Sequence, residues 1–236
     1  MAVPRAILIH GSGGDHRGWA LQSPRFPGSV AVDLPGHPDG TALDHLDALV
    51  ATLAGALERV DGPRVLVGHS LGGAAALATA LARPDLVEGV VVLSTGARLP
   101  VPDSAMDRLR ADFDAERERV VEGSITDGGS PAARRAREAI DACGPAGMAA
   151  DYAACRSVDL RGRLGGLSVP VLIVHGADDH LVPVWLGEEL ARELPMAQMV
   201  VVPGARHAPM SDAPGTVDLL LAAYLARLEL SLDDDG

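Results

Sequence analysis

Two kinds of apolar run alternate along this chain. Short runs rich in Val, Ile and Leu end in Gly, Pro or a small polar residue, and longer runs rich in Ala and Leu repeat their apolar positions every three or four residues. The short runs predict strands, and the long runs predict amphipathic helices. Strands are expected at residues 6–9, 29–32, 64–68, 87–93, 169–174 and 198–202, and helices at 43–60, 71–83, 184–194 and 214–228. Near-continuous apolar strands joined by helices are typical of a parallel sheet covered on both faces, so the pattern predicts an α/β fold with about six mostly parallel strands.

The alternation stops between residues 97 and 167, where no strand is expected and the charge density rises. Asp103 or Ser104 can cap a helix that runs to about Val121. Pro131 suits the first turn of a second helix. The apolar side of the first helix consists of Met106, Leu109, Phe113 and Val120. We therefore expect a helical cap at residues 97–167, inserted into an α/β core made of residues 1–96 and 168–236.

Composition and charge narrow the range of partners. The chain has 236 residues, of which 47% are hydrophobic and 22% charged, and its net charge is −12. This balance is typical of a globular protein with a continuous core. Phosphate contacts need clustered positive charge, so we expect neither nucleic acid nor a membrane surface as a partner. All 20 residues counted as Lys or Arg are Arg, which excludes a catalytic or Schiff-base lysine.

The N-terminus and the cysteines indicate where the protein works. The first apolar run is only four residues long, too short for a signal peptide or a membrane span. The two cysteines, Cys143 and Cys155, do not make a disulfide framework. We expect a cytoplasmic protein that is a monomer or a small homo-oligomer.

The strongest chemical signal is Gly68-His69-Ser70-Leu71-Gly72, at the point where an expected strand ends and an expected helix begins. Glycines two residues on either side of a serine are needed where the chain turns so sharply that neighbouring side chains would clash. Such a turn exposes the serine hydroxyl at the positive end of the following helix. A lone Gly-x-Ser-x-Gly is a weak signal, and the strand–turn–helix context strengthens it.

Five motifs in order resemble those of the α/β-hydrolase superfamily along nearly the whole core. They are a His-Gly loop at residues 7–14, an Asp-x-x-Gly-His turn at 33–37, the serine turn at 67–73, an acid strand at 170–179 and a histidine loop at 202–207. The resemblance implies an α/β-hydrolase fold. Members of that superfamily commonly begin with an antiparallel pair of strands, whereas this sequence starts almost directly at the His-Gly strand. We therefore expect six strands instead of eight.

The resemblance also implies a catalytic triad. Ser70 is the expected nucleophile, and its hydroxyl needs a base such as His207 to take its proton. A carboxylate must hold the imidazole of that base and stabilise its charged form. Asp178 and Asp179 compete for this role, and the family's spacing after the strand favours Asp179.

The expected oxyanion hole and pocket complete the site. The amide of Leu71 follows the nucleophile, and the resemblance assigns the second donor to Ser12, with Gly13 as the alternative. Candidates for the substrate pocket are Gly11, Gly13, His69, Trp19, Met106, Phe113, Tyr152 and Trp185. For the last five of these residues, from Trp19 to Trp185, core packing is the favoured interpretation. Metal-ligand, dinucleotide and Walker patterns are missing from the sequence, so we expect no metal and no cofactor.

These features predict a serine hydrolase that cleaves carboxylic esters of small aliphatic acyl groups. The chain has few aromatic residues, so an aliphatic pocket fits better than one built for stacking. The same triad could also serve a carbon–carbon bond hydrolase, a lactonase or a thioesterase. An equally acidic carrier protein as partner is disfavoured by the net charge. A lyase or synthase, or a ligand-binding protein without catalysis, is the alternative from a different class.

Overall fold

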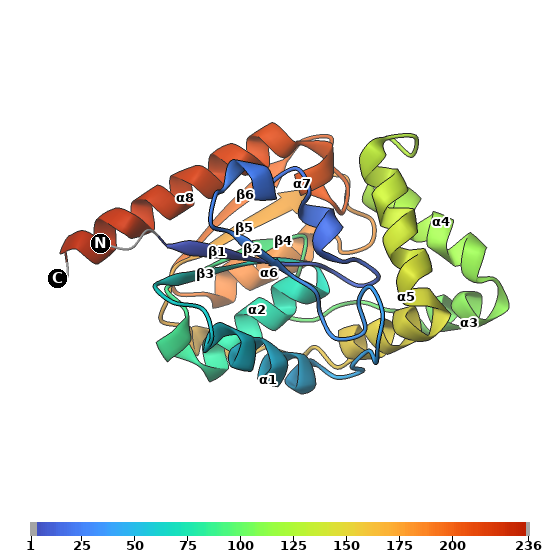
Figure 1. Ribbon diagram of the computed structural model, residues 1–236, viewed down its shortest axis with the longest axis horizontal. Helices are drawn as coiled ribbons and strands as arrows, with labels where there is room; N and C mark the ends of the chain where they lie inside the picture. The colour runs from blue at the N-terminus through green and yellow to red at the C-terminus, as the bar shows by residue number, and fades with distance from the viewer. Residues whose placement is uncertain (1–3, 235–236) are drawn as a thin grey trace.

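A parallel sheet of six strands forms the centre of the protein (Figure 1). The computed structural model describes residues 4–234. The strands follow the order β2-β1-β3-β4-β5-β6, and every neighbouring pair is parallel. Their bounds are β1 Arg5–Ile9, β2 Val30–Val32, β3 Arg64–His69, β4 Gly89–Leu93, β5 Val171–Gly176 and β6 Ala197–Val202. The predicted α/β fold with six parallel strands is confirmed.

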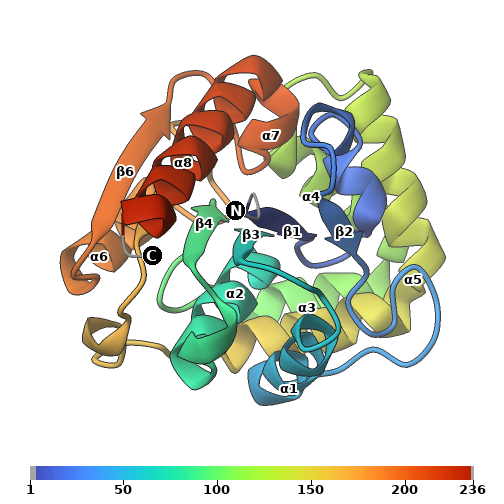
Figure 2. The same ribbon diagram turned by 60° about the vertical axis from the view of Figure 1, so that its left-hand side comes forward.

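Two apolar clusters, one on each face, hold helices against the sheet. The helices α1 (Leu46–Leu57), α2 (Leu71–Ala82) and α6 (Val184–Glu193) pack on one face. The short α7 (Pro209–Asp212) and the long α8 (Pro214–Asp234) cover the other face. Figure 2 shows α8 and the pair α1 and α2 on opposite sides of the strands. Burial of both faces explains why the central strands are almost wholly apolar.

Three helices lie between β4 and β5 in the sequence and cover the carboxyl ends of the strands (Figure 1). They are α3 (Asp103–Ala111), α4 (Phe113–Ser124) and α5 (Pro131–Arg156), and α5 is kinked at Gly144. The start of α5 at Pro131 agrees with the sequence. The division of the chain into a core and a cap at residues 97–167 stays a prediction, and residues 1–3 and 235–236 of the predicted core lie outside the described residues.

The predicted single helix from residue 103 to about Val121 is wrong, because the chain breaks at Asp112. Asp112 has an extended backbone, with φ −155° and ψ 96°. Its side chain accepts a hydrogen bond from the Ala115 amide at 3.0 Å, which caps α4. Aspartate is favoured at such caps because its side chain competes with the helix backbone for hydrogen bonds, and apolar periodicity alone does not reveal the break.

None of the helices described within residues 4–234 combines the length and the apolar character needed to cross a lipid bilayer.

Replacing the capping residue tests this explanation of the break. We expect Asp112→Ala to lower the free energy of unfolding by about 1 kcal/mol, the usual cost of losing an N-cap. Asp112→Asn keeps the capping oxygen and should lose only a few tenths of that amount. Urea denaturation of both variants measures the difference. Equal losses in the two variants would show that the charge of Asp112, and not its cap, stabilises the break.

Candidate active site

The carboxyl ends of four strands bring the predicted chemistry to one edge of the sheet, beneath α3, α4 and α5 (Figure 1). The His-Gly loop follows β1, Ser70 follows β3, Asp179 follows β5 and His207 follows β6. The strand order reverses between β1 and β3, because β2 lies on the outer side of β1. Ligand sites of open parallel sheets form at such a switch point.

Ser70 occupies a sharp turn between β3 and α2. Its backbone has φ 53° and ψ −117°, a conformation that residues with a side chain rarely adopt. A side chain on Gly68 would overlap the Gly72 carbonyl, and one on Gly72 would overlap the His10 carbonyl. The Ser70 amide donates to the Leu93 carbonyl at 2.9 Å and fixes the turn to the end of β4. The glycine spacing thus allows three backbone segments to meet around the serine.

Asp179 holds the ring of His207. The Nδ1 atom of His207 donates to Oδ2 of Asp179 at 2.8 Å, and both side chains are buried. The other carboxylate oxygen accepts the amides of Leu181 and Val182, each at 2.9 Å. Asp178, the competing candidate, is exposed. The spacing argument therefore selected the aspartate that contacts the histidine.

The surroundings of Asp179 favour its charged form. Burial alone would raise the pKa of this carboxyl, but the charge of His207 and the hydrogen bonds to both oxygens outweigh burial and hold the pKa well below its ordinary value. A permanently ionised Asp179 keeps Nδ1 of His207 protonated, so Nε2 is the ring atom that is free to accept a proton. The described hydrogen bonds include none between the His207 ring and the Ser70 hydroxyl, although both residues line the same cavity. Such bonds are often long in unliganded enzymes.

His69, the residue before Ser70, forms a hydrogen bond with the loop that carries His207. Its Nε2 donates to the His207 carbonyl at 2.9 Å, and the two ring centres lie 4.8 Å apart. Burial and the neighbouring His207 lower the pKa of His69 to about 3, so its ring is neutral at ordinary pH. His69 therefore acts here as a hydrogen-bond donor and not as a charge.

The three amides considered for the oxyanion hole, those of Leu71, Ser12 and Gly13, differ in their hydrogen-bond partners. Leu71 is the first residue of α2, so its amide has no acceptor within the helix. The Gly13 amide donates to Oδ2 of Asp151 at 2.6 Å and is thereby occupied. The described hydrogen bonds assign no acceptor to the Ser12 amide, and Ser12 lines the cavity beside Ser70. This hydrogen bond argues against Gly13 as the oxyanion donor, and Ser12 remains the candidate.

A cavity of about 550 Å³, called here the Ser70 cavity, opens beside Ser70 and His207. Its apolar walls come from the segment after β4, from the inserted helices and from the loop after β5. These walls are Leu99, Pro100, Val101, Pro102, Ala105, Val120, Met148, Tyr152, Leu181, Val182 and Pro183. The walls suit an aliphatic group.

The predicted pocket residues divide into three groups. Tyr152 and His69 line the Ser70 cavity. Gly11, Gly13 and Trp19 line a second, neighbouring cavity. Met106, Phe113 and Trp185 line neither, and their assignment to the pocket is corrected. Met106 and Phe113 pack against the core, in agreement with the favoured interpretation of these two residues, whereas Trp185 is 42% exposed beneath the guanidinium of Arg98.

Sequence reasoning missed Glu116, which lines the Ser70 cavity. Its carboxylate is 2% exposed, accepts the Tyr152 hydroxyl at 3.0 Å and accepts the Arg108 guanidinium at 2.6 Å. Burial and the charge of Glu116 raise the pKa of Tyr152 above its ordinary value. Glu116 lies on the apolar side of α4, three residues after Phe113 and four before Val120. A charge at apolar spacing is the signal that could have found it.

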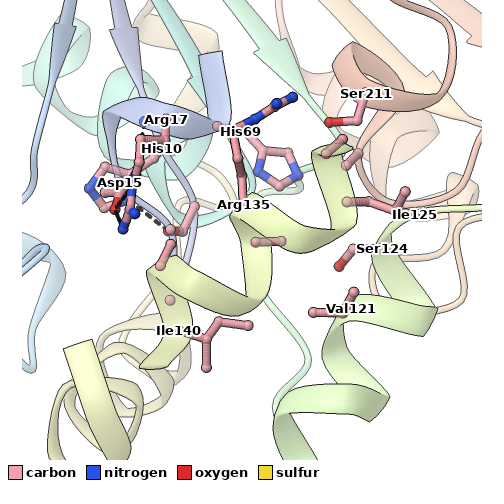
Figure 3. A pocket seen from close by; sticks show the side chains of 18 of the residues that line it. His10, Asp15, Arg17, His69, Val121, Ser124, Ile125, Arg135, Ile140 and Ser211 are labelled. Carbon is pink, nitrogen blue, oxygen red and sulfur yellow. Dashed lines mark hydrogen bonds and ion pairs between the residues drawn. The ribbon is translucent and has the colours of Figure 1, made fainter. Parts of the chain in front are cut away.

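The second cavity, called here the Arg135 cavity, has a volume of about 90 Å³ and shares Ser12, His69, Val120 and Ser124 with the Ser70 cavity. Figure 3 shows that the side chains of Arg135 and His69 both point into it. Among the side chains that the structure describes, no carboxylate pairs with the half-buried Arg135. Trp19, fully buried at the same cavity, leaves its Nε1 without a partner. The cavity thus holds an uncompensated cation.

The described part of the chain contains no group of three or more His, Cys, Asp or Glu side chains arranged to hold a metal ion. Cys143 and Cys155 are both free thiols.

Comparison with known proteins agrees with this geometry. The model of the family described as "Alpha/beta hydrolase family" matches residues 6–218. The pimeloyl-[acyl-carrier protein] methyl ester esterase of Neisseria meningitidis serogroup B, strain H44/76, is 30% identical over 226 residues, covering 88% of this chain and 87% of that protein. The protein of the same name from Nitrosomonas europaea is 29% identical over 240 residues, covering 89% of this chain and 91% of that protein.

Solved structures show the same arrangement of elements. A thermophilic esterase superposes with a TM-score of 0.84 at 27% identity, over 94% of this chain and 90% of its own. The enol-lactonase of Burkholderia xenovorans LB400 superposes with a TM-score of 0.87 at 22% identity, over 96% of this chain and 92% of its own. At 22% identity, the likeness to the enol-lactonase shows a common fold and nothing more.

The close approach at Gly72 can be tested by adding one methyl group. We expect Gly72→Ala to lower the free energy of unfolding by about 1–3 kcal/mol, because the added carbon meets the His10 carbonyl, which cannot move aside freely. The matched control is Gly55→Ala in α1, where the added carbon meets open space. The control should be neutral or stabilising by about 0.5–1 kcal/mol. Urea denaturation of both variants provides the comparison, and a Gly72→Ala protein as stable as the control would contradict the tight turn.

Proposed function

The chain belongs to the alpha/beta hydrolase family and is an ester hydrolase, and on that premise we propose that it cleaves carboxylic esters of small aliphatic acyl groups through an acyl-enzyme on Ser70. The observation that carries the proposal is the convergence of Ser70 and His207, whose ring Asp179 holds, on one cavity with largely apolar walls. We further propose that residues 97–167 act as a cap whose helices set the size of that cavity.

In the proposed reaction each catalytic group acts once in acylation of the enzyme and once in deacylation. Nε2 of His207 takes the hydroxyl proton of Ser70 while the serine oxygen attacks the ester carbonyl, and the amides of Leu71 and Ser12 receive the charge that develops on the carbonyl oxygen. The tetrahedral intermediate collapses, and the leaving alcohol takes the proton from His207. Water then attacks the acyl-enzyme, gives its proton to His207 and releases the acid, while Ser70 regains its hydroxyl. Asp179 keeps the ring oriented and stabilises its charged form.

The proposal predicts the activity of variants on p-nitrophenyl esters of increasing acyl length. Ser70→Ala should lose at least about a thousandfold in kcat/KM, because no acyl-enzyme can form. Asp179→Asn should lose up to about 10⁴-fold in kcat, because the ring of His207 is no longer held in the productive tautomer. The chain length with the highest kcat/KM would measure the Ser70 cavity. If wild type and Ser70→Ala hydrolyse the series equally slowly, the proposal fails.

A second candidate substrate is an ester that also carries an anionic group. The curated relatives are named for a methyl ester whose acyl group is attached to a carrier protein. The observation that favours such a substrate here is Arg135, whose guanidinium lacks a carboxylate partner among the described residues and points into the cavity next to Ser12. A buried or half-buried cation gains most from an anion that it can hydrogen-bond directly. The overall charge of −12 opposes a large acidic partner and leaves a local anion as the better fit.

Paired variants of equal charge separate a local contact from the overall field. With monomethyl esters of C4 to C7 diacids, we expect Arg135→Gln to raise KM by about tenfold or more, which corresponds to one charge-assisted hydrogen bond. The dimethyl esters of the same acids should change by less than about twofold. Arg134→Gln removes the same charge from an exposed neighbour that lies 3.9 Å from Glu138, and it should leave both series unchanged. Equal effects of the two variants would contradict a specific role for Arg135.

A further inference from the structure

A buried ion pair lies beneath the His-Gly loop and lines neither cavity. The carboxylate belongs to Asp151 on α5, and its Oδ1 atom accepts the Nε2 of His37 at 3.1 Å. The side chain of His37 is fully buried and that of Asp151 is 5% exposed. Burying two charges is costly unless each is paired and its remaining hydrogen bonds are satisfied. The second oxygen of Asp151 accepts a hydrogen bond from the Gly13 amide, 2.6 Å away, whereas Nδ1 of His37 is buried without a hydrogen-bond partner.

The hydrogen bond between Gly13 and Asp151 constrains a loop whose glycines would otherwise leave its backbone flexible. Gly11, Gly13 and Gly14 give residues 11–14 access to many backbone conformations. An oxyanion hole is effective only when its donors are already in place before charge develops. Within the loop, the Gly14 amide donates to the Gly11 carbonyl at 3.0 Å. Among the described hydrogen bonds, the one from Gly13 to Asp151 ties this loop to the inserted helices.

A neighbouring histidine acts on the peptide group that carries the Ser12 amide. Nδ1 of His10 donates to the Gly11 carbonyl at 2.8 Å, and its Nε2 accepts the Leu34 amide at 2.9 Å. Hydrogen bonds to a carbonyl polarise the N–H of the same peptide group, which here belongs to Ser12. The rings of His10 and His37 meet edge to face with centres 4.9 Å apart. The loop is therefore fixed from both ends.

From these contacts, and resting on the proposed function, we propose that Asp151 and His37 form a positioning pair that fixes residues 11–14 so that the Ser12 amide serves as the second oxyanion donor. Neither residue touches substrate. The pair acts by occupying the Gly13 amide and by orienting the peptide before it.

The charge of His37 completes the pair. Burial alone would lower the pKa of His37, but the hydrogen bond and the charge of Asp151, together with the neighbouring Cys143, outweigh it and raise that pKa to about 10. A protonated His37 offsets the charge of the carboxylate beside it. A lone carboxylate so near the oxyanion hole would repel the charge that develops there, so His37 makes the position of Asp151 compatible with catalysis.

The test compares Asp151→Asn with Tyr224→Phe. Asparagine keeps the shape but turns one accepting oxygen into a donor, so one of the contacts to Gly13 and His37 is lost. Tyr224 is a buried side chain that bonds Val90 and Pro170 far from both cavities, so its loss controls for stability alone. We expect Asp151→Asn to lower kcat by about 10- to 100-fold with KM within about threefold, since removing an oxyanion donor outright costs 10²–10³-fold. Tyr224→Phe should keep kcat within about twofold.

Binding of a trifluoromethyl ketone, which forms a tetrahedral adduct with an active serine, isolates the oxyanion hole. Asp151→Asn should weaken binding of the ketone by the same factor by which it lowers kcat, and it should leave binding of the carboxylic acid product unchanged. Hydrogen exchange of the peptide containing residues 11–14 should become faster. Unchanged ketone binding, or equal weakening of ketone and acid, would overturn the proposal.

Two further arms keep the test decisive. If Asp151→Asn does not fold, His37→Gln takes its place, because it retains a hydrogen-bond donor but leaves the carboxylate without a compensating charge. His37→Gln should likewise lower kcat and leave KM nearly unchanged. An unchanged kcat would overturn the proposal. The wild type and Ser70→Ala are run alongside. A wild type that forms no adduct with the ketone refutes the proposed function, whereas an adduct that Asp151→Asn binds equally well refutes the positioning pair alone.

Discussion

The turn at Ser70 constrains the rest of the site. A residue with a side chain stays at φ 53° only where the surrounding backbone holds it there. Here the start of α2 lies so close to the end of β1 that Gly72 has no room for a methyl group beside the His10 carbonyl. The same closeness brings the His-Gly loop next to the serine. The turn and the loop are thus consequences of one backbone contact.

Two buried histidine–carboxylate pairs attach loops to the two sides of this turn, and they share one design. In each pair, one carboxylate oxygen accepts an imidazole and the other accepts backbone amides: Asp179 holds His207 and the segment after β5, and Asp151 holds His37 and Gly13. Satisfying both oxygens is what makes a buried carboxylate tolerable. As a result, each pair fixes the backbone as well as the imidazole.

The sequence predicted those features that depend on local chemistry. Alternating apolar runs located the six strands, and the glycines around Ser70 located the turn. Spacing also separated Asp179 from Asp178, because the first faces the sheet edge and the second faces solvent. The break at Asp112 comes from a local cap on the Ala115 amide, which apolar periodicity does not register. The partners of Asp151 depend on contacts between distant segments, which periodicity does not encode either. Trp185 was misplaced for the same reason, since an exposed ring over Arg98 and a pocket wall look alike in a sequence.

Two buried charges of the inserted helices occupy positions where an apolar side chain is expected. Glu116 and Asp151 each lie where the three- and four-residue spacing of α4 and α5 calls for an apolar side chain, and each is buried with partners from another element. Such residues shape the cavity and the oxyanion loop without belonging to any of the five motifs. A solved esterase and a solved enol-lactonase share the fold of this chain. Under the proposed function, the inserted helices supply much of the wall of the Ser70 cavity, and their buried charges hold Tyr152 and the His-Gly loop in place.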